Sequence, residues 1–272
     1  MSLGVVIKGP EGVVLSTDSR VTLEGHPPEG PPIVVNFDNA TKLLKFGGKQ
    51  SHVGAVTYGA AIIGLRTAHS YLPEFEQEFK DELRLAILEF SKKLSAFFQK
   101  RWDEATPKDY AGPGMTFIVG GYDEGAAYGR VFLFEIPGKP EPIEQHLGEQ
   151  NFGMTWGGQL QIASRLIHGF DPALAQILRQ KLQINESELT RLLDVIRQQL
   201  MFTIPYNVLP LQDCVDLATF MVRTTITAQA LYVGIRGVGG PIEVATITRT
   251  DGFKYVQRKR IRGEAGMSGE GD

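Results

Sequence analysis

The residues of this chain that could do chemistry begin at its second position. Ser2 follows the initiator Met1 and is small enough for that methionine to be trimmed. The trimmed residue would carry both a hydroxyl and a free α-amine, whose reference pKa of about 7.7–8.0 leaves a useful fraction as neutral base near pH 7. A hydroxyl needs such a neighbouring base to attack a carbonyl. Ser2 alone could therefore do what a serine and a histidine do together elsewhere.

Two charged residues and a glycine complete the candidate site. Asp18 lies in the run Gly12–Arg20, Lys42 precedes the apolar pair Leu43-Leu44, and Gly59 stands between an apolar strand pattern and Ala60. Each residue also has a structural interpretation. Asp18 could cap the exit of a strand, and Lys42 could point into solvent from an edge strand. Gly59 could only permit a tight turn, and Ser2 could be merely a common second residue.

The segment through these positions resembles the proteasome β-subunit family and its bacterial relatives, which are N-terminal-nucleophile (Ntn) hydrolases. Counting back from Gly-Val-Val-Leu-x-x-Asp-x-Arg, here Gly12 to Arg20, puts the family's N-terminal threonine on Ser2 and its acidic residue on Asp18. The family's lysine falls on Lys42, and its glycine between strand and first helix falls on Gly59. The match is clear over residues 2–70 and weak and gapped beyond, which is typical of a divergent, bacterial-type member.

The resemblance implies a mechanism for these residues. The Ser2 hydroxyl attacks the scissile carbonyl while its own α-amine accepts the proton. Lys42, as a nearby cation, lowers the pKa of that amine and favours the developing alkoxide, and Asp18 pairs with the buried lysine. The backbone N–H of Gly59, at a helix N-terminus, is expected to donate to the tetrahedral oxyanion, an interaction typically worth about 3–4 kcal/mol.

The supporting half of the family's site differs here. The family's Gly-Ser-Gly-Ser turn is best matched by residues 156–159, Trp-Gly-Gly-Gln, which lack the serine hydroxyl. The later Asp-x-x-Ser-Gly-Gly pattern is matched by residues 235–240, with Ile235 in place of the aspartate and Val238 in place of the serine. These differences keep two alternatives open: a catalytically inactive structural ring subunit or binding scaffold, and an amidase or acyl transferase acting on a small amide.

Positions around the family's substrate pocket match small or uncharged residues, which suggests apolar side chains next to the cleaved bond: Val21, Ala40, Leu44, Thr57 and Ala61. The resemblance implies a peptide or protein substrate and self-association into a ring-type homo-oligomer. The apolar face of residues 83–98 could bury against another subunit or against the chain's own core. The resemblance also allows an ATPase partner, which the sequence does not identify.

Composition limits the other function classes. The chain has 272 residues, of which 42% are hydrophobic and 22% charged, and its net charge is −3. This balance gives no reason to expect nucleic acid or a membrane surface as a partner. The sequence lacks a signal-peptide pattern and any uninterrupted apolar run near the ~20 residues that span a bilayer, so we expect a cytoplasmic protein. Cys214 is the sole cysteine, and we expect it to be a buried structural thiol.

No cofactor or metal is expected. The sequence has no Gly-Lys-Ser/Thr phosphate loop and no Gly-x-Ser-x-Gly elbow, and its five histidines fall at no ligand spacing. His168 precedes Gly169 and is expected to cap a helix end. The basic cluster Arg258-Lys259-Arg260 with Arg262 is expected to be a solvated end of a strand.

The pattern of apolar and turn residues predicts which elements position this site. Strands are predicted at residues 3–8 and 13–17, which form a hairpin, and at 42–46, 52–58, 115–119, 130–135, 242–248 and 253–257. Helices are predicted to open at 60–65 and to cover 83–100, the segment after Asp171-Pro172, the segment after a capping box at Asn185–Glu188, and residues 213–230. Loops are expected at Gly25 to Pro32 and around Pro137, Pro140 and Pro142.

This order of elements fits one α+β domain over residues 1–262, with a disordered tail at 263–272. The resemblance makes the expectation more specific, because Ntn hydrolases are four-layer αββα sandwiches.

Overall fold

The computed structural model describes residues 2–25, 30 and 33–261. Within these residues the strands form two five-stranded sheets and one two-stranded sheet. The first large sheet has the order β10-β1-β2-β11-β12 and the second the order β5-β6-β7-β8-β9. The strands of the first sheet are β1 (Leu3–Lys8), β2 (Val13–Thr17), β10 (Gly153–Gly158), β11 (Glu243–Thr248) and β12 (Gly252–Gln257). Those of the second are β5 (Leu43–Lys45), β6 (Val53–Gly59), β7 (Met115–Gly121), β8 (Arg130–Ile136) and β9 (Lys139–Gln145).

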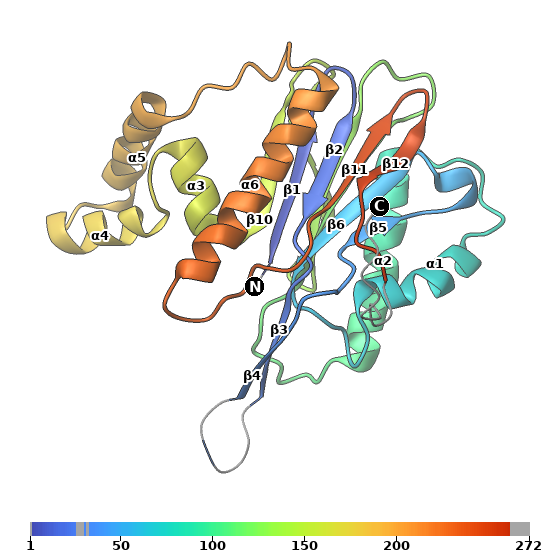
Figure 1. The fold of residues 1–272 in the computed structure, drawn as a ribbon, viewed down its shortest axis with the longest axis horizontal. Helices are drawn as coiled ribbons and strands as arrows, with labels where there is room; N and C mark the ends of the chain where they lie inside the picture. The colour runs from blue at the N-terminus through green and yellow to red at the C-terminus, as the bar shows by residue number, and fades with distance from the viewer. Residues whose placement is uncertain (1, 26–29, 31–32, 262–272) are drawn as a thin grey trace, which may run out of the picture.

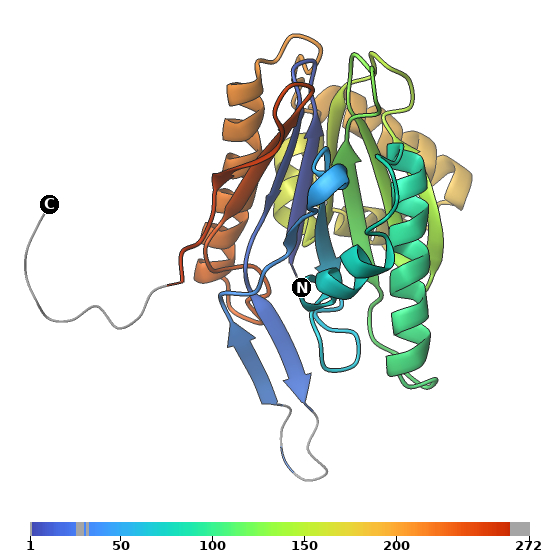
Figure 2. The same ribbon diagram turned by 90° about the vertical axis from the view of Figure 1, so that its right-hand side faces the viewer.

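The two large sheets pack face to face, and helices lie on their outer sides. Apolar residues between the sheets, among them Val6, Leu15 and Ile118, are fully buried. On the first sheet lie α3 (Leu160–His168) and α6 (Leu211–Leu231), and on the second lie α1 (Leu72–Glu78) and α2 (Ile87–Ala105). Figure 2 shows α6 and α2 on opposite sides of the strands. The expected mixture of helices and sheets is confirmed.

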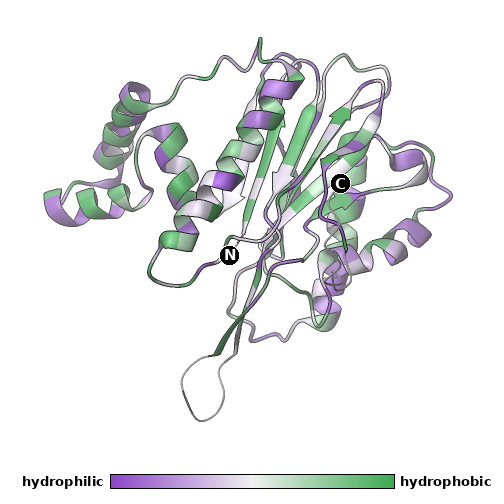
Figure 3. Cartoon of the chain, in the orientation of Figure 1, coloured by the Kyte–Doolittle hydropathy of each residue, from purple (hydrophilic) through white to green (hydrophobic). Residues whose placement is uncertain are grey.

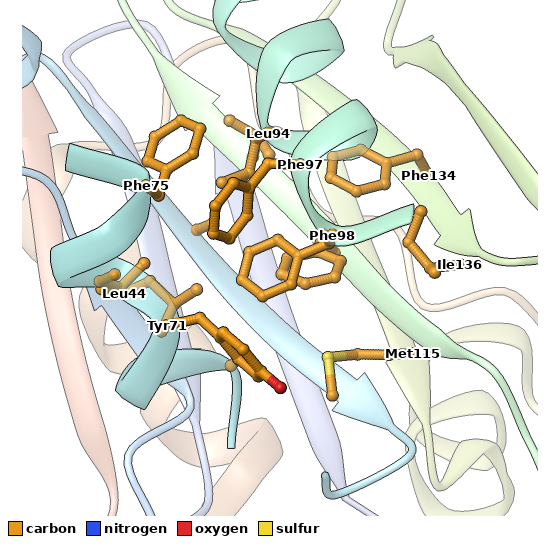
Figure 4. Close-up of a cluster of buried hydrophobic side chains, with 14 of the residues drawn as sticks. Leu44, Tyr71, Phe75, Leu94, Phe97, Phe98, Met115, Phe134 and Ile136 are labelled. Carbon is orange, nitrogen blue, oxygen red and sulfur yellow. The ribbon is translucent and has the colours of Figure 1, made fainter. Parts of the chain in front are cut away.

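The helix α2 buries its apolar face within this chain. Ile87, Phe90, Leu94 and Phe97 recur at helical spacing and are all buried. They pack with α1 and the outer face of the second sheet in an aromatic cluster (Figure 4). Phe75 is in edge contact with both Phe90 and Phe97. The apolar face predicted over residues 83–98 therefore belongs to the chain's own core, except Leu83, which is exposed.

Most predicted elements are confirmed with small shifts of their ends. The hairpin of β1 and β2 has the predicted bounds, and Asn185 begins α5 (Glu186–Leu200) with a complete capping box to Glu188. The helix after Asp171-Pro172 is α4 (Ala173–Leu182). Gly169 ends α3 in the left-handed conformation, directly after His168. Cys214 is buried, as expected.

The helix predicted to open at residues 60–65 is absent. The chain instead makes a tight turn closed by Ile63 and Arg66, and the next α-helix begins at Leu72. Gly59 and Gly64 both have positive φ, at 91° and 60°, and such residues cannot start or continue a right-handed helix. The apolar run over residues 60–65 is therefore not a helical segment: Ile63 is buried, whereas Leu65 is almost fully exposed.

The loop predicted around the prolines is observed at Pro137, in the turn between β8 and β9, but the segment that follows is a strand. Pro140 and Pro142 lie within β9, which pairs only with β8 at the edge of its sheet. Proline has no backbone N–H to donate to a neighbouring strand. An edge strand can contain proline because the residues on its open side need no such hydrogen bond.

Three further strands are not predicted: β10, and the hairpin of β3 (Val21–Gly25) with β4 (Ile33–Phe37). Of α3 the sequence predicts only the end, at His168. The β3–β4 hairpin projects from the rest of the molecule (Figure 1). The loop expected at Gly25 to Pro32 falls between its strands, and residues 26–29 and 31–32 lie outside the described residues. Figure 3 shows apolar residues concentrated on the central strands and present also on this hairpin.

The solvated cluster predicted at the end of β12 is confirmed for Arg258 and Arg260, which are exposed, and is wrong for Lys259; Arg262 lies outside the described residues. The side chain of Lys259 is only 12% exposed, and its ammonium lies 2.8 Å from the carboxylate of buried Glu243. The tail expected at 263–272 lies outside the described residues. In the part of the chain that the structure describes, no helix is both long enough and apolar enough to cross a membrane.

Candidate functional site

The strand ends around β1 bring three of the predicted residues together. Ser2 directly precedes β1, Asp18 directly follows β2, and Lys42 directly precedes β5. The Lys42 ammonium donates to Ser2 Oγ at 2.8 Å and to Asp18 Oδ1 at 2.9 Å. All three side chains are buried, Asp18 completely. The site therefore joins the two large sheets, because Lys42 reaches from the second sheet to residues of the first.

The Lys42 ammonium has a partner for each of its protons. Its third acceptor is the carbonyl oxygen of Arg20, in a very short contact. An ammonium has three donors and no acceptor, so this arrangement fits the charged form of the side chain. Burial lowers the pKa of Lys42, and the neighbouring carboxylate of Asp18 opposes that shift. In this geometry Lys42 acts as a donor toward Ser2 and not as a base.

Backbone N–H groups hold Asp18 in place. Its Oδ1 accepts from the N–H of Leu3 at 3.0 Å, and its Oδ2 accepts from Arg20 at 3.0 Å and Gly239 at 3.1 Å. A carboxylate bonded to several N–H groups and an ammonium is fixed in orientation and compensated for its burial. The bond from Leu3 also ties Asp18 to the residue that follows Ser2.

The two segments that lack the family's polar side chains still contact the site through their backbones. Gln159 donates its N–H to the carbonyl oxygen of Ser2 at 2.7 Å. Gly158 has φ 96°, and a Cβ there would collide with that same carbonyl. In the second segment, Gly239 donates to Asp18, whereas Val238 is buried in an apolar cluster and Ile235 is partly exposed. These contacts could not be predicted from the sequence, because they are made by backbone groups. The only sequence feature at these positions is the presence of glycines.

Gly59 lies at the end of β6 and not at a helix N-terminus. The following residue, Ala60, donates its N–H to the carbonyl oxygen of Gly114 at 2.8 Å. That carbonyl also occupies the space where a Cβ of Gly59 would lie. The expected support from a helix dipole is therefore wrong, and the glycine itself is required by the close approach of the next strand.

Four of the five predicted pocket residues line a small cavity beside Ser2, with a volume of about 20 Å³. They are Val21, Ala40, Thr57 and Ala61. Leu44 is the exception: it is fully buried in the aromatic cluster beneath α1 (Figure 4), where it packs on the outer face of the second sheet beside its strand partner Ala55. The sequence missed other lining residues, among them Tyr58 and Thr67. Burial raises the pKa of Tyr58 to about 12, so its hydroxyl stays neutral.

An ion pair outside the cavity connects the surrounding loops. Arg20 holds Asp38 through two hydrogen bonds of 2.5 and 2.8 Å, and it also donates to the carbonyl oxygen of Arg236. The side-chain hydrogen bonds to Asp38 raise the pKa of Arg20 and lower that of Asp38. This contact links the segment before Lys42 to the loop that supplies Gly239.

Comparison with known proteins gives a likeness of structure. No protein-family model and no curated protein sequence matches the chain. A Gly-1 mutant of Anbu from Hyphomicrobium sp. strain MC1 is 14% identical with a TM-score of 0.54, covering 98% of this chain and 89% of that chain. Another Anbu structure from that strain is 15% identical with a TM-score of 0.52, covering 97% and 89%.

Anbu (ancestral beta-subunit) from Yersinia bercovieri is 14% identical with a TM-score of 0.52, covering 95% of this chain and 88% of that chain. Likeness at such low identity concerns the fold alone. The chain thus shares the fold of these Anbu structures.

Proposed function

We propose that the chain is an Ntn hydrolase with the family's four-layer αββα sandwich, and that it cleaves a peptide or other amide bond with Ser2 after removal of Met1. The observation that carries the proposal is the Lys42 ammonium, which donates to both Ser2 Oγ and Asp18 Oδ1. A buried ammonium next to a hydroxyl stabilises an alkoxide that develops there. The Anbu-like fold supports a hydrolase of this type.

The proton of the Ser2 hydroxyl then needs a separate acceptor. Lys42 already donates all its protons, and it is the only hydrogen-bond partner of Ser2 Oγ among the described residues. The α-amine that removal of Met1 would free on Ser2 has a suitable pKa near neutrality and lies on the same residue. We therefore assign it the role of base.

The reaction proceeds in two steps. Ser2 Oγ attacks the carbonyl carbon as its proton passes to the α-amine, directly or through water, and the C–N bond breaks as the leaving amine takes that proton. Water then attacks the ester, which releases the acid and restores the serine. The N–H of Gly59 is proposed to donate to the oxyanion in both steps, and Asp18 keeps Lys42 in place.

The proposal is tested by mass spectrometry on the purified chain. Intact mass is expected to show loss of Met1, and a β-lactone probe is expected to add once to Ser2. Ser2→Ala should abolish the adduct, and Ser51→Ala, at an exposed serine, should retain it. Retained Met1 with no adduct would overturn the proposal. That outcome would favour the inactive structural subunit, which the apolar Val238 at the family's serine position also favours.

We also propose that the chain works as a homo-oligomer. Exposed apolar side chains on α4 and α5, including Ile177, Leu182 and Val195, have no partner among the described residues that buries them. Extended apolar surface of this kind is typical of protein interfaces. Sedimentation of the purified protein should give a mass of at least twice the mass of one chain. A mass equal to that of one chain at micromolar concentration would contradict the proposal.

A further inference from the structure

Two neighbouring cavities of very different size lie near the candidate site, and Ser2 lines the smaller one. The inner cavity holds about 20 Å³, and its walls near Ser2 include Ala40, Ala60 and Ala61. A water molecule needs about 10–15 Å³ of such space, so the inner cavity admits a group of roughly the size of a methyl. A large side chain cannot enter it without displacing the strands that form its walls.

The outer cavity is far larger, with a volume of about 610 Å³. It shares Val21, Ala40 and Thr67 with the inner cavity, so the two cavities lie next to each other. Its other apolar walls are Leu23 and Phe37 from the projecting β3–β4 hairpin and Ile62 from the turn after β6. Phe37 is 57% exposed and has room to cover a bound group.

The charge of the outer cavity favours an uncharged occupant. Among the described residues that line it, Asp38 is the only charged one. Arg20 neutralises that carboxylate with two hydrogen bonds. The remaining polar walls are the amides of Asn36 and Asn39 and the hydroxyl of Thr67. Apolar walls with a few neutral polar groups are typical of sites for apolar ligands.

We propose that the outer cavity is a substrate-binding site for a large apolar side chain, and that the inner cavity restricts the residue at the attacked carbonyl to glycine or alanine. This inference rests on the proposed function, and it narrows the substrate to a peptide with a small residue at the cleaved bond and a bulky apolar residue close to it. Phe37 is the specificity-determining residue of the outer cavity, because it is the largest apolar side chain in the described lining and is exposed to an occupant.

Cleavage of internally quenched peptides tests this inference. Each peptide has a central alanine, with phenylalanine or glycine at the neighbouring positions on both sides. Wild type should cleave next to alanine and should prefer the phenylalanine peptide by at least about tenfold in kcat/KM. Phe37→Ala should lose most of that preference. The matched control is Ile33→Ala, an exposed apolar residue of the same strand that does not line the cavity, and it should keep the preference.

A second measurement separates this inference from the proposed function. A small β-lactone that fills only the inner cavity should label Phe37→Ala as fast as wild type. Equal cleavage of both peptides by a wild type that the lactone labels would overturn the inference alone. If the lactone does not label wild type, the proposed function fails. The inference is then tested by fluorescence anisotropy, which measures how tightly the fluorescent peptides bind to the protein. Tighter binding of the phenylalanine peptide, lost in Phe37→Ala, would support the cavity, and equal binding would overturn it.

Discussion

The ammonium of Lys259 donates a hydrogen bond of 2.9 Å to the carbonyl oxygen of Ala40. Ala40 lines the inner cavity and stands two residues before Lys42. Lys259 follows the last strand, and its charge is compensated by buried Glu243 at 2.8 Å. The end of the first sheet therefore anchors the segment that carries the site lysine. The positive charge of Lys259 also contributes, after burial, to the lowered pKa of Lys42.

Replacing Lys259 by Met should free this segment and leave Glu243 buried without its cation. Removing one partner of a buried ion pair costs about 3–5 kcal/mol of unfolding free energy. Amide hydrogen exchange should become faster over residues 38–44. The double variant Glu243→Met with Lys259→Met should recover most of the stability while the fast exchange persists. Lys254→Met, at an exposed lysine, is the control, and unchanged exchange in Lys259→Met would refute the anchor.

Replacing Asp18 by Asn should both destabilise the fold and prevent labelling of Ser2. The N–H groups of Arg20 and Gly239 and the ammonium of Lys42 all donate hydrogen bonds to Asp18. In asparagine the NH₂ group would replace one of the accepting oxygens, so at least one of these donors would face another donor. The buried Lys42 would also lose its counter-charge, so we expect a loss of about 3 kcal/mol or more in urea unfolding. Asp109→Asn, at an exposed position, should change neither quantity. A labelled and stable Asp18→Asn protein would show that the pair is dispensable.

Replacing Gly158 by Ala should displace Ser2. Its φ of 96° disfavours any side chain, and the added methyl would collide with the Ser2 carbonyl oxygen. Lactone labelling should be lost and the melting temperature should fall. Gly48→Ala is the matched control, because Gly48 also has positive φ, at 57°, but has open space around it. Gly48→Ala should lower the free energy of unfolding only by the backbone strain, which is about 1–2 kcal/mol. Similar effects of the two variants would mean that the contact with Ser2 does not matter.

The thiol of Cys214 should make stability depend on pH. Burial raises the pKa of Cys214 from 9.0 to about 11. The folded state therefore keeps a proton that the unfolded state loses, and the resulting stabilisation is complete below pH 9 and declines as the pH rises toward 11. At pH 10 the loss is about 1 kcal/mol.

The measurement is urea unfolding of wild type and Cys214→Ala at pH 8 and pH 10. The difference between the two proteins isolates the thiol from the tyrosines, two of which have a pKa raised to about 12. Wild type should lose more stability than the variant between these pH values. Parallel losses would show that the thiol is not protected from ionisation.

The sequence by itself determined the elements whose pattern is local. The hairpin of β1 and β2, the apolar face of α2 and the capping box of α5 follow from residue spacing and short-range hydrogen bonds. It also singled out Ser2, Asp18 and Lys42, through the resemblance of residues 2–70 to a known family. The first three signals are local in the chain and the resemblance depends on the order of residues along it, so none of them needs the rest of the fold.

Only the tertiary structure decided which groups surround those residues. Gly239 and Gln159 contact the site through backbone N–H groups, which every non-proline residue has, so their use depends on how distant segments meet. The placement of Pro140 in a strand depends on that strand lying at a sheet edge. Leu44 is predicted to line the pocket but packs in the aromatic cluster beneath α1, and Lys259 is predicted to be solvated but is mostly covered and paired with Glu243. Whether these side chains are buried, and which groups they pair with, depends on how the sheets pack. The spacing of residues along the chain does not show this.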